Sequence, residues 1–226
     1  MQLTAAIIVF GGTIGACLVN STMADFIRGL KMGKAAFVEK KVDLGKTLDE
    51  LVELAALSRR EGLIALEAKI AEVKDAFLAR TLEHAVDGVS AADLRTLMEA
   101  DLALEEKTET TAAGVFEAAG GYAPTVGILG AVLGLIHVME NLDDPSKLGP
   151  GIAVAFVATV YGVGFANVVC LPMSFKLKRH MEHDQLIKQM VLEGVVGIQS
   201  GVAPGALRSK LKVYLGNHGG GHADKK

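Results

Sequence analysis

This sequence contains little cysteine and proline, and its net charge is small. Its 226 residues include 2 Cys and 5 Pro, and 23 Lys plus Arg against 26 Asp plus Glu leave a formal net charge of -3. Both cysteines, Cys17 and Cys170, lie inside apolar stretches, and no CxxC or Cys/His ligand pattern occurs. We therefore expect no disulfide framework, no bound metal and no cofactor. The small net charge also gives no reason to expect a nucleic-acid partner.

Apolar residues are abundant instead. They make up 50% of the chain, and the mean hydropathy is +0.37. A helix needs about 20 predominantly apolar residues to cross ~30 Å of hydrocarbon, and the stretches 3–20, 122–139 and 149–175 meet this need. The sequence predicts an all-α, polytopic membrane protein with three transmembrane helices and a helical cytoplasmic domain.

Basic residues near the ends of the spans predict the orientation in the membrane. Lys and Arg follow the first span at positions 28, 31 and 34 and the third at 176, 178 and 179, whereas the loop 140–148 is net acidic. Because basic residues are retained on the cytoplasmic side, we place the long region after the first span, and the C-terminal region, in the cytoplasm. The predicted division is 1–20 membrane helix, 21–119 cytoplasmic helical domain, 120–175 membrane hairpin, 176–217 C-terminal helical segment and 218–226 disordered tail.

The predicted cytoplasmic region has the pattern of helices. No proline occurs between positions 21 and 120, and apolar residues recur at helical spacing. Thr47-Leu-Asp-Glu50 and Ser90-Ala-Ala-Asp93 are typical of N-terminal capping boxes, and Asp87-Gly88 indicates a turn. We predict helices at 47–60, 62–85, 90–120 and 174–200, the third running into the second span and the last continuing the third span.

No Asp, Glu, Lys or Arg occurs in the middle of any span. Pumps and proton channels normally hold an ionisable group at membrane depth. If ions cross the membrane here, the titrating group must therefore come from another chain.

Small residues recur at intervals of four within the spans, as in Gly11 and Gly15 or Gly130 and Gly134. This spacing lets helix backbones approach closely. The pattern is compatible both with packing inside the chain and with an oligomer interface.

Pro124 and Pro172 lie at the predicted cytoplasmic ends of the second and third spans. Either residue could simply kink or end its helix at the membrane surface. The alternative is that both are hinges that transmit movement from the membrane to the cytoplasmic domain. The sequence favours the first interpretation.

Several stretches in order resemble one protein family. "APTVGILGAVLGLIHVM", "DDPSKLGPGIAVAFVATVYGVGFAN" and "LPMSFKLK" resemble the last two membrane helices of the MotA/PomA flagellar stator proteins. "SRREGLIALE" is similar to that family's cytoplasmic motif, and "LEGVVGIQSGVAPGALRSKLKVYL" to its C-terminal region. The resemblance covers the chain to about residue 215.

The family has four spans, and "LTAAIIVFGGTIGACLVNS" resembles the second of them. Nothing in the sequence matches the first span, and we expect a missed upstream start or a trimmed segment rather than a true three-span stator. The related ExbB/TolQ energy transducers have three spans and fit the topology, but the ordered motifs favour the stator. A passive membrane scaffold is the remaining alternative. We expect no enzyme activity.

The resemblance implies a stator subunit in the bacterial inner membrane. Five copies would surround two copies of a MotB-like partner, whose single membrane helix brings an aspartate to the ion path. Arg59, Arg60 and Glu67 match charged positions that engage the rotor protein FliG.

The resemblance also suggests which ion is used. Sodium-type members have a threonine where this chain has Ala131, and Na⁺ requires several oxygen ligands. Thr159 matches a threonine shared by both ion types, and its simplest structural role is a hydrogen bond to its own helix. The expected ion is H⁺.

Overall fold

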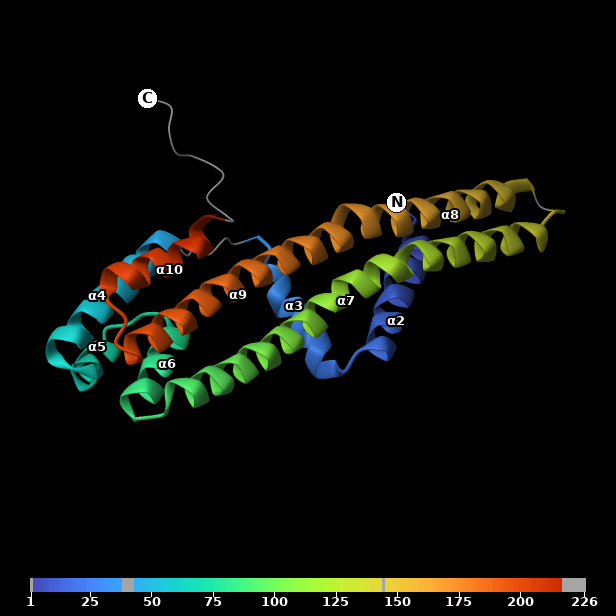
Figure 1. Ribbon diagram of the computed structural model, residues 1–226. Helices are drawn as coiled ribbons and strands as arrows, with labels where there is room; N and C mark the ends of the chain where they lie inside the picture. The colour runs from blue at the N-terminus through green and yellow to red at the C-terminus, as the bar shows by residue number, and fades with distance from the viewer. Residues whose placement is uncertain (1, 38–42, 144, 217–226) are drawn as a thin grey trace, which may run out of the picture. The chain divides into compact units, whose positions relative to one another are not determined.

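The computed structural model describes residues 2–37, 43–143 and 145–216. All regular elements in these ranges are helices (Figure 1), which confirms the all-α prediction. Three helical stretches are long and apolar enough to cross a membrane: Leu3–Asn20, Ala91–Met139 and Leu148–Gln199. The predicted tail 218–226 lies outside the described residues.

Contacts divide the chain into two units. One comprises residues 1–39 and 107–180, and the other comprises 40–106 and 181–226. The predicted domain boundaries follow expected membrane surfaces instead, so that division remains a prediction. The long helices α7 (Ala91–Met139) and α9 (Leu171–Gln199) contribute residues to both units.

The first unit contains the apolar spans. Its other elements are α1 (Leu3–Ala6), the π-helix η1 (Ile7–Gly11), α2 (Gly12–Asn20), α3 (Met23–Ala35), α8 (Pro145–Gly164) and the π-helix η3 (Phe165–Cys170). The first span is thus one helical stretch with a π-helical turn, and it packs on α8. Phe10 of η1 anchors this contact, with its ring centroid 6.0 Å from that of Tyr161 and 5.1 Å from that of Phe165.

Glycines let α7 and α8 pack backbone to backbone. A Cβ on Gly127 would lie 2.9 Å from a carbonyl oxygen of α8, and one on Gly134 would lie 3.0 Å from a backbone nitrogen of α8. A Cβ on Gly162 would collide with a carbonyl oxygen of α7. The small residues of the hairpin therefore pack within the chain. By contrast, a Cβ on Gly11 or Gly15 would meet nothing within 4 Å, so this pair packs closely against no other helix among the described residues.

The second unit is a helical domain around one apolar core. Its further elements are α4 (Leu44–Glu61), the 3₁₀-helix η2 (Leu63–Leu66), α5 (Glu67–Ile70), α6 (Ala76–Val86) and α10 (Pro204–Gly216). α10 lies along α4 (Figure 1). The most deeply buried core side chains include Leu51, Leu66, Leu78, Leu82, Leu94, Met190, Leu207 and Leu211.

Two of the predicted local features of this unit are confirmed. The Ser90 hydroxyl accepts from the Asp93 backbone N–H at 3.1 Å, which is the N-cap half of the predicted capping box, and it donates to the Asp93 carboxylate at 2.6 Å. The turn at Asp87-Gly88 is also present, with Gly88 at a φ of 85°. α7 then continues without interruption into the second span, as predicted.

The predicted capping box at Thr47 is wrong. α4 begins earlier, because the Asp43 carboxylate accepts from the backbone N–H groups of Gly45 and Lys46 at 3.0 and 3.4 Å. Thr47 consequently lies inside the helix, where its hydroxyl is 3.4 Å from the Asp43 carbonyl. The carboxylate satisfies free N–H groups of the first turn, so no second cap is needed.

The predicted single helix 62–85 is also wrong. Residues 71–75 separate α5 from α6, and the Asp75 carboxylate caps α6 by accepting from the Leu78 N–H at 2.7 Å. The break lets Leu66 and Leu78 both enter the core. α10 was not predicted as a separate helix, and the turn at Gly201, with φ of 70°, precedes it.

Candidate functional site

The end of α4 presents two of the charged residues singled out by sequence. Arg59 and Arg60 lie in the last helical turn, and both are exposed. Gly62 follows with a φ of 89°, a backbone conformation that favours glycine. The chain then turns into η2, whose Leu66 is fully buried in the core. This anchor holds the segment 59–67 at the surface of its unit.

The electrostatic surroundings of the two arginines differ. The Arg60 guanidinium donates to the Glu61 carboxylate at 2.8 Å in an exposed pair. Arg59 makes no ion pair with any residue that the structure describes. Both cations lie near the negative end of the helix dipole, an interaction that contributes about 0.3–1 kcal/mol at exposed sites. Intramolecular contacts therefore leave most of this positive charge available to a partner.

Glu67 begins α5 and is exposed. A carboxylate in a first helical turn interacts favourably with the positive end of the helix dipole. The structure thus places Arg59 and Arg60 at the exposed end of α4 and Glu67, also exposed, at the first position of α5.

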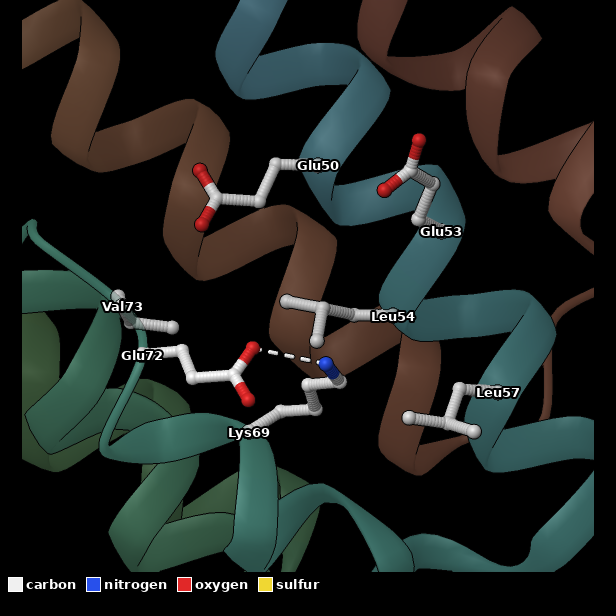
Figure 2. A pocket seen from close by; sticks show the side chains of 7 residues that line it. All are labelled: Glu50, Glu53, Leu54, Leu57, Lys69, Glu72 and Val73. Carbon is white, nitrogen blue, oxygen red and sulfur yellow. Dashed lines mark hydrogen bonds and ion pairs between the residues drawn. The ribbon is translucent and has the colours of Figure 1, made fainter.

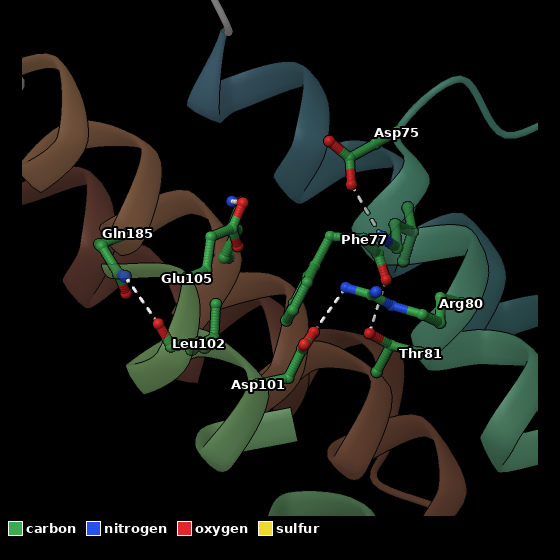
Figure 3. A network of polar contacts seen from close by, with 10 residues as sticks. Asp75, Phe77, Arg80, Thr81, Asp101, Leu102, Glu105 and Gln185 are labelled. Carbon is green, nitrogen blue, oxygen red and sulfur yellow. Dashed lines mark hydrogen bonds and ion pairs between the residues drawn. The ribbon is translucent and has the colours of Figure 1, made fainter. Parts of the chain in front are cut away.

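A polar network elsewhere in the second unit involves α6, α7 and α9 (Figure 3). The Arg80 guanidinium of α6 donates to the Asp101 carboxylate of α7 at 2.5 Å and lies 5.9 Å from the centre of the Phe77 ring. Gln185 of α9 donates to the Leu102 carbonyl at 3.2 Å. These contacts join α6, α7 and α9, and sequence reasoning did not identify them because no pattern pairs residues so far apart.

A second ionic cluster joins α7, α9 and α10. The Glu193 carboxylate accepts from the Arg95 guanidinium and, at 2.6 Å, from the Lys210 ammonium group. Hydrogen bonds from Arg95 lower the pKa of Glu193 to about 2, opposed by partial burial and assisted by Lys210. The carboxylate is therefore firmly ionised at neutral pH and holds three helices in register.

The polar side chains of the spans hydrogen bond mainly to their own helices. Thr159 donates to the Ala155 carbonyl at 3.3 Å, Asn167 to Val163 at 2.9 Å, and Thr125 to Tyr122 at 2.8 Å. Thr159 is half-buried, and so is Ala131 on the facing helix α7. These hydroxyl and amide groups could extend a water chain, but none of them can carry a charge at neutral pH.

Neither proline ends its helix. Pro124 lies within α7, and Pro172 is the second residue of α9, directly after η3. Of the first interpretation, the part in which the prolines end their helices is therefore wrong, and the part in which they kink them remains a prediction. Proline lacks an N–H, and its ring crowds the carbonyl of the preceding turn. A wider π-helical turn such as η3 can accommodate that crowding. Whether either residue is a hinge remains a prediction.

No group of three or more His, Cys, Asp or Glu side chains in the described part of the chain is arranged to hold a metal ion.

A family model and individual relatives place this chain in the same protein family. Residues 69–190 match the MotA/TolQ/ExbB proton channel family. The chain is 34% identical to the chemotaxis protein PomA of Vibrio alginolyticus over 95% of its own length and 84% of that protein. It is 38% identical to motility protein A of Bacillus subtilis over 93% of this chain and 78% of that protein.

Solved structures match as well. A C. jejuni MotAB structure gives a TM-score of 0.90 at 29% identity, covering 99% of this chain and 86% of the other. The flagellar MotAB stator complex of Bacillus subtilis gives 0.85 at 37% identity, covering 93% and 83%. The family match alone does not separate stators from ExbB/TolQ transducers, but these relatives do. The chain belongs to the MotA/TolQ/ExbB proton channel family and, within it, to the MotA/PomA flagellar motor stator proteins.

Proposed function

We propose that this protein is the subunit of a flagellar stator that surrounds a MotB-like partner and converts ion flow into torque on the rotor. The observation that carries the proposal is the agreement over nearly the whole chain with MotAB structures. It is supported by spans that lack a carboxylate, because a family built to move protons must then obtain its titrating group from a second protein.

In this proposal the protein lies in the bacterial inner membrane, with the second unit in the cytoplasm. Five copies form the wall around two MotB-like helices, and a partner aspartate carries the ion. Each charge that crosses supplies about 2.3 kcal/mol per 100 mV. Arg59, Arg60 and Glu67 would make the contact with a FliG-like rotor protein.

The proposed ion is H⁺. Ala131 has no side-chain oxygen with which to replace sodium's hydration shell. Thr159 does not bear on the choice, because the family's threonine at that position is shared by both ion types. A proton needs only the partner carboxylate and a chain of water or hydroxyl groups. Pro124 and Pro172 are the proposed hinges between the spans and the parts of α7 and α9 beyond them.

The test is complementation of a strain that lacks its own stator genes, with this gene together with a gene for a MotB-like protein from the same organism. Swimming speed should fall with a protonophore and should not change with external sodium at fixed ionic strength. A speed that follows sodium concentration would overturn the proton assignment. Absence of motility and of co-purification with the MotB-like protein would instead favour a passive scaffold or an ExbB/TolQ-like transducer.

A further inference from the structure

A cavity of about 340 Å³ opens between α4 and the chain that includes α5. Figure 2 shows its lining. Four of the lining residues come from α4 and three from α5 and the turn that follows: Glu50, Glu53, Leu54, Leu57, Lys69, Glu72 and Val73. The sequence hints at these residues only through Glu and Lys pairs spaced three apart, a pattern common on any exposed helix.

Three of the lining side chains are apolar, and they come from both walls: Leu54 and Leu57 from α4, and Val73 from the turn after α5. Leu54 is a buried member of the core, and Leu57 and Val73 are half-buried and pack against that core. These side chains add hydrocarbon to the lining of the cavity. Apolar contacts of this kind suit the aliphatic stem of a long side chain.

The charged lining residues leave uncompensated negative charge in the cavity. The single lining cation, Lys69, bonds to the Glu72 carboxylate at 2.7 Å, and this partner raises the pKa of Lys69. Glu50 and Glu53 form no ion pair with any residue in the described ranges. Partial burial, then repulsion by Asp75 and Glu53, raises the pKa of Glu50. The folded protein therefore holds these carboxylates against partial desolvation and mutual repulsion. A cation supplied by a binding partner would offset both unfavourable effects.

We propose that this cavity receives an arginine or lysine side chain of the rotor protein, with its charged head between Glu50 and Glu53 and its stem along Leu54. The proposal rests on the proposed stator function. Charge complementarity and the apolar lining residues favour a long basic side chain over a bare cation. A metal ion is disfavoured because the described part of the chain holds no cluster of three potential ligands.

The position of the cavity fits a shared binding face. Glu53 and Arg60 are seven residues apart on α4, and two helical turns place such residues on nearly the same side, about 10 Å apart along the axis. The face would then offer an anionic pocket beside a cationic helix end. A matching partner helix must carry a basic and an acidic side chain at a similar spacing.

The experiment measures affinity between the complete complex, purified in detergent with its MotB-like partner, and the FliG-like rotor protein of the same organism. Glu53→Gln should weaken binding about ten-fold at low salt, as expected for loss of a charge-assisted hydrogen bond. Glu50→Gln should weaken binding similarly. It should also make the free protein more resistant to unfolding, because it removes a carboxylate whose charge is disfavoured by partial burial and by repulsion from Asp75 and Glu53. The matched control Glu83→Gln, an exposed glutamate of α6, should bind within two-fold of the wild type.

Wild-type affinity in both cavity variants would overturn the cavity assignment and leave the stator function standing. A change in the size of the complex by light scattering, with unchanged rotor affinity, would identify a second copy of this chain as the occupant and also overturn it. Failure of the wild-type complex to bind the rotor protein at all would overturn both proposals. Recovery of rotor binding when Glu53→Arg is combined with a basic-to-acidic change on the rotor would confirm the pairing.

Discussion

The cluster around Glu193 allows a quantitative prediction for the substitution Glu193→Gln. The ordinary pKa of this carboxyl is 4.5 and its pKa in the folded protein is about 2. A difference of this size corresponds to roughly 3 kcal/mol of stability if nothing screens the charges. The side chain of Glu193 is only 18% exposed, but those of Arg95 and Lys210 are 37% and 53% exposed, so water screens part of the interaction. We expect Glu193→Gln to cost about 1–2 kcal/mol at pH 7.

The sign of the pH dependence follows from the lowered pKa. A carboxyl whose pKa is lower in the folded protein stabilises it fully above the unfolded value of 4.5 and loses that contribution as pH falls towards 2. The difference between wild type and Glu193→Gln should therefore be constant near neutral pH and shrink between pH 4.5 and 2.

Pulse proteolysis across a urea series in detergent measures the effect. Asp49→Asn is the matched control, because it removes an exposed pair with Arg208 at 2.7 Å that also joins two helices of the same unit. Exposed pairs contribute about 0–1 kcal/mol, so the control should lose about 0.5 kcal/mol or less. Equal losses in the two variants, or a deficit for Glu193→Gln that stays constant down to pH 2, would refute the reasoning.

Three further predictions concern the spans and the rotor face. Gly162→Val should prevent hairpin packing and sharply reduce the amount of folded protein in the membrane, because a Cβ at this position would collide with a carbonyl of α7. The control Gly164→Ala should accumulate normally, because a Cβ there would meet nothing within 4 Å. Reversal of Arg59 and Arg60 to Glu should abolish motility with membrane levels unchanged, and wild-type torque would contradict the rotor assignment. Pro172→Ala should keep MotB-like partner binding and lose torque if this proline is a hinge; loss of the protein from the membrane would show a structural role instead.

Local sequence patterns alone predicted the secondary structure correctly where a single pattern, such as a long apolar run or a capping motif, defines the element. The apolar spans, the cap at Ser90 and the continuous run of α7 into the second span were all predicted from local patterns. Such features depend on residues within a few turns of one another, so the sequence displays them directly. The family resemblance, carried by several motifs in order, likewise identified the stator group.

Tertiary contacts decided the rest. The helix breaks before α6 because Asp75 caps α6 and because Leu66 and Leu78 enter the core from two different elements. The sequence did not reveal this break, since the helical spacing of apolar residues continues through it. The ion pairs of Glu193 join residues 98 and 17 positions away in the chain, with no local signature.

The candidate sites divide in the same way. Arg59, Arg60 and Glu67 were found from a contiguous motif, and their exposure follows from the end of α4 and the buried anchor at Leu66. The cavity beside them became visible only when α5 was placed against α4, because a pocket is made by the approach of two elements. Charge and hydrophobicity are properties of the sequence, but which charges are left without a partner is settled only by the packing of the helices that carry them.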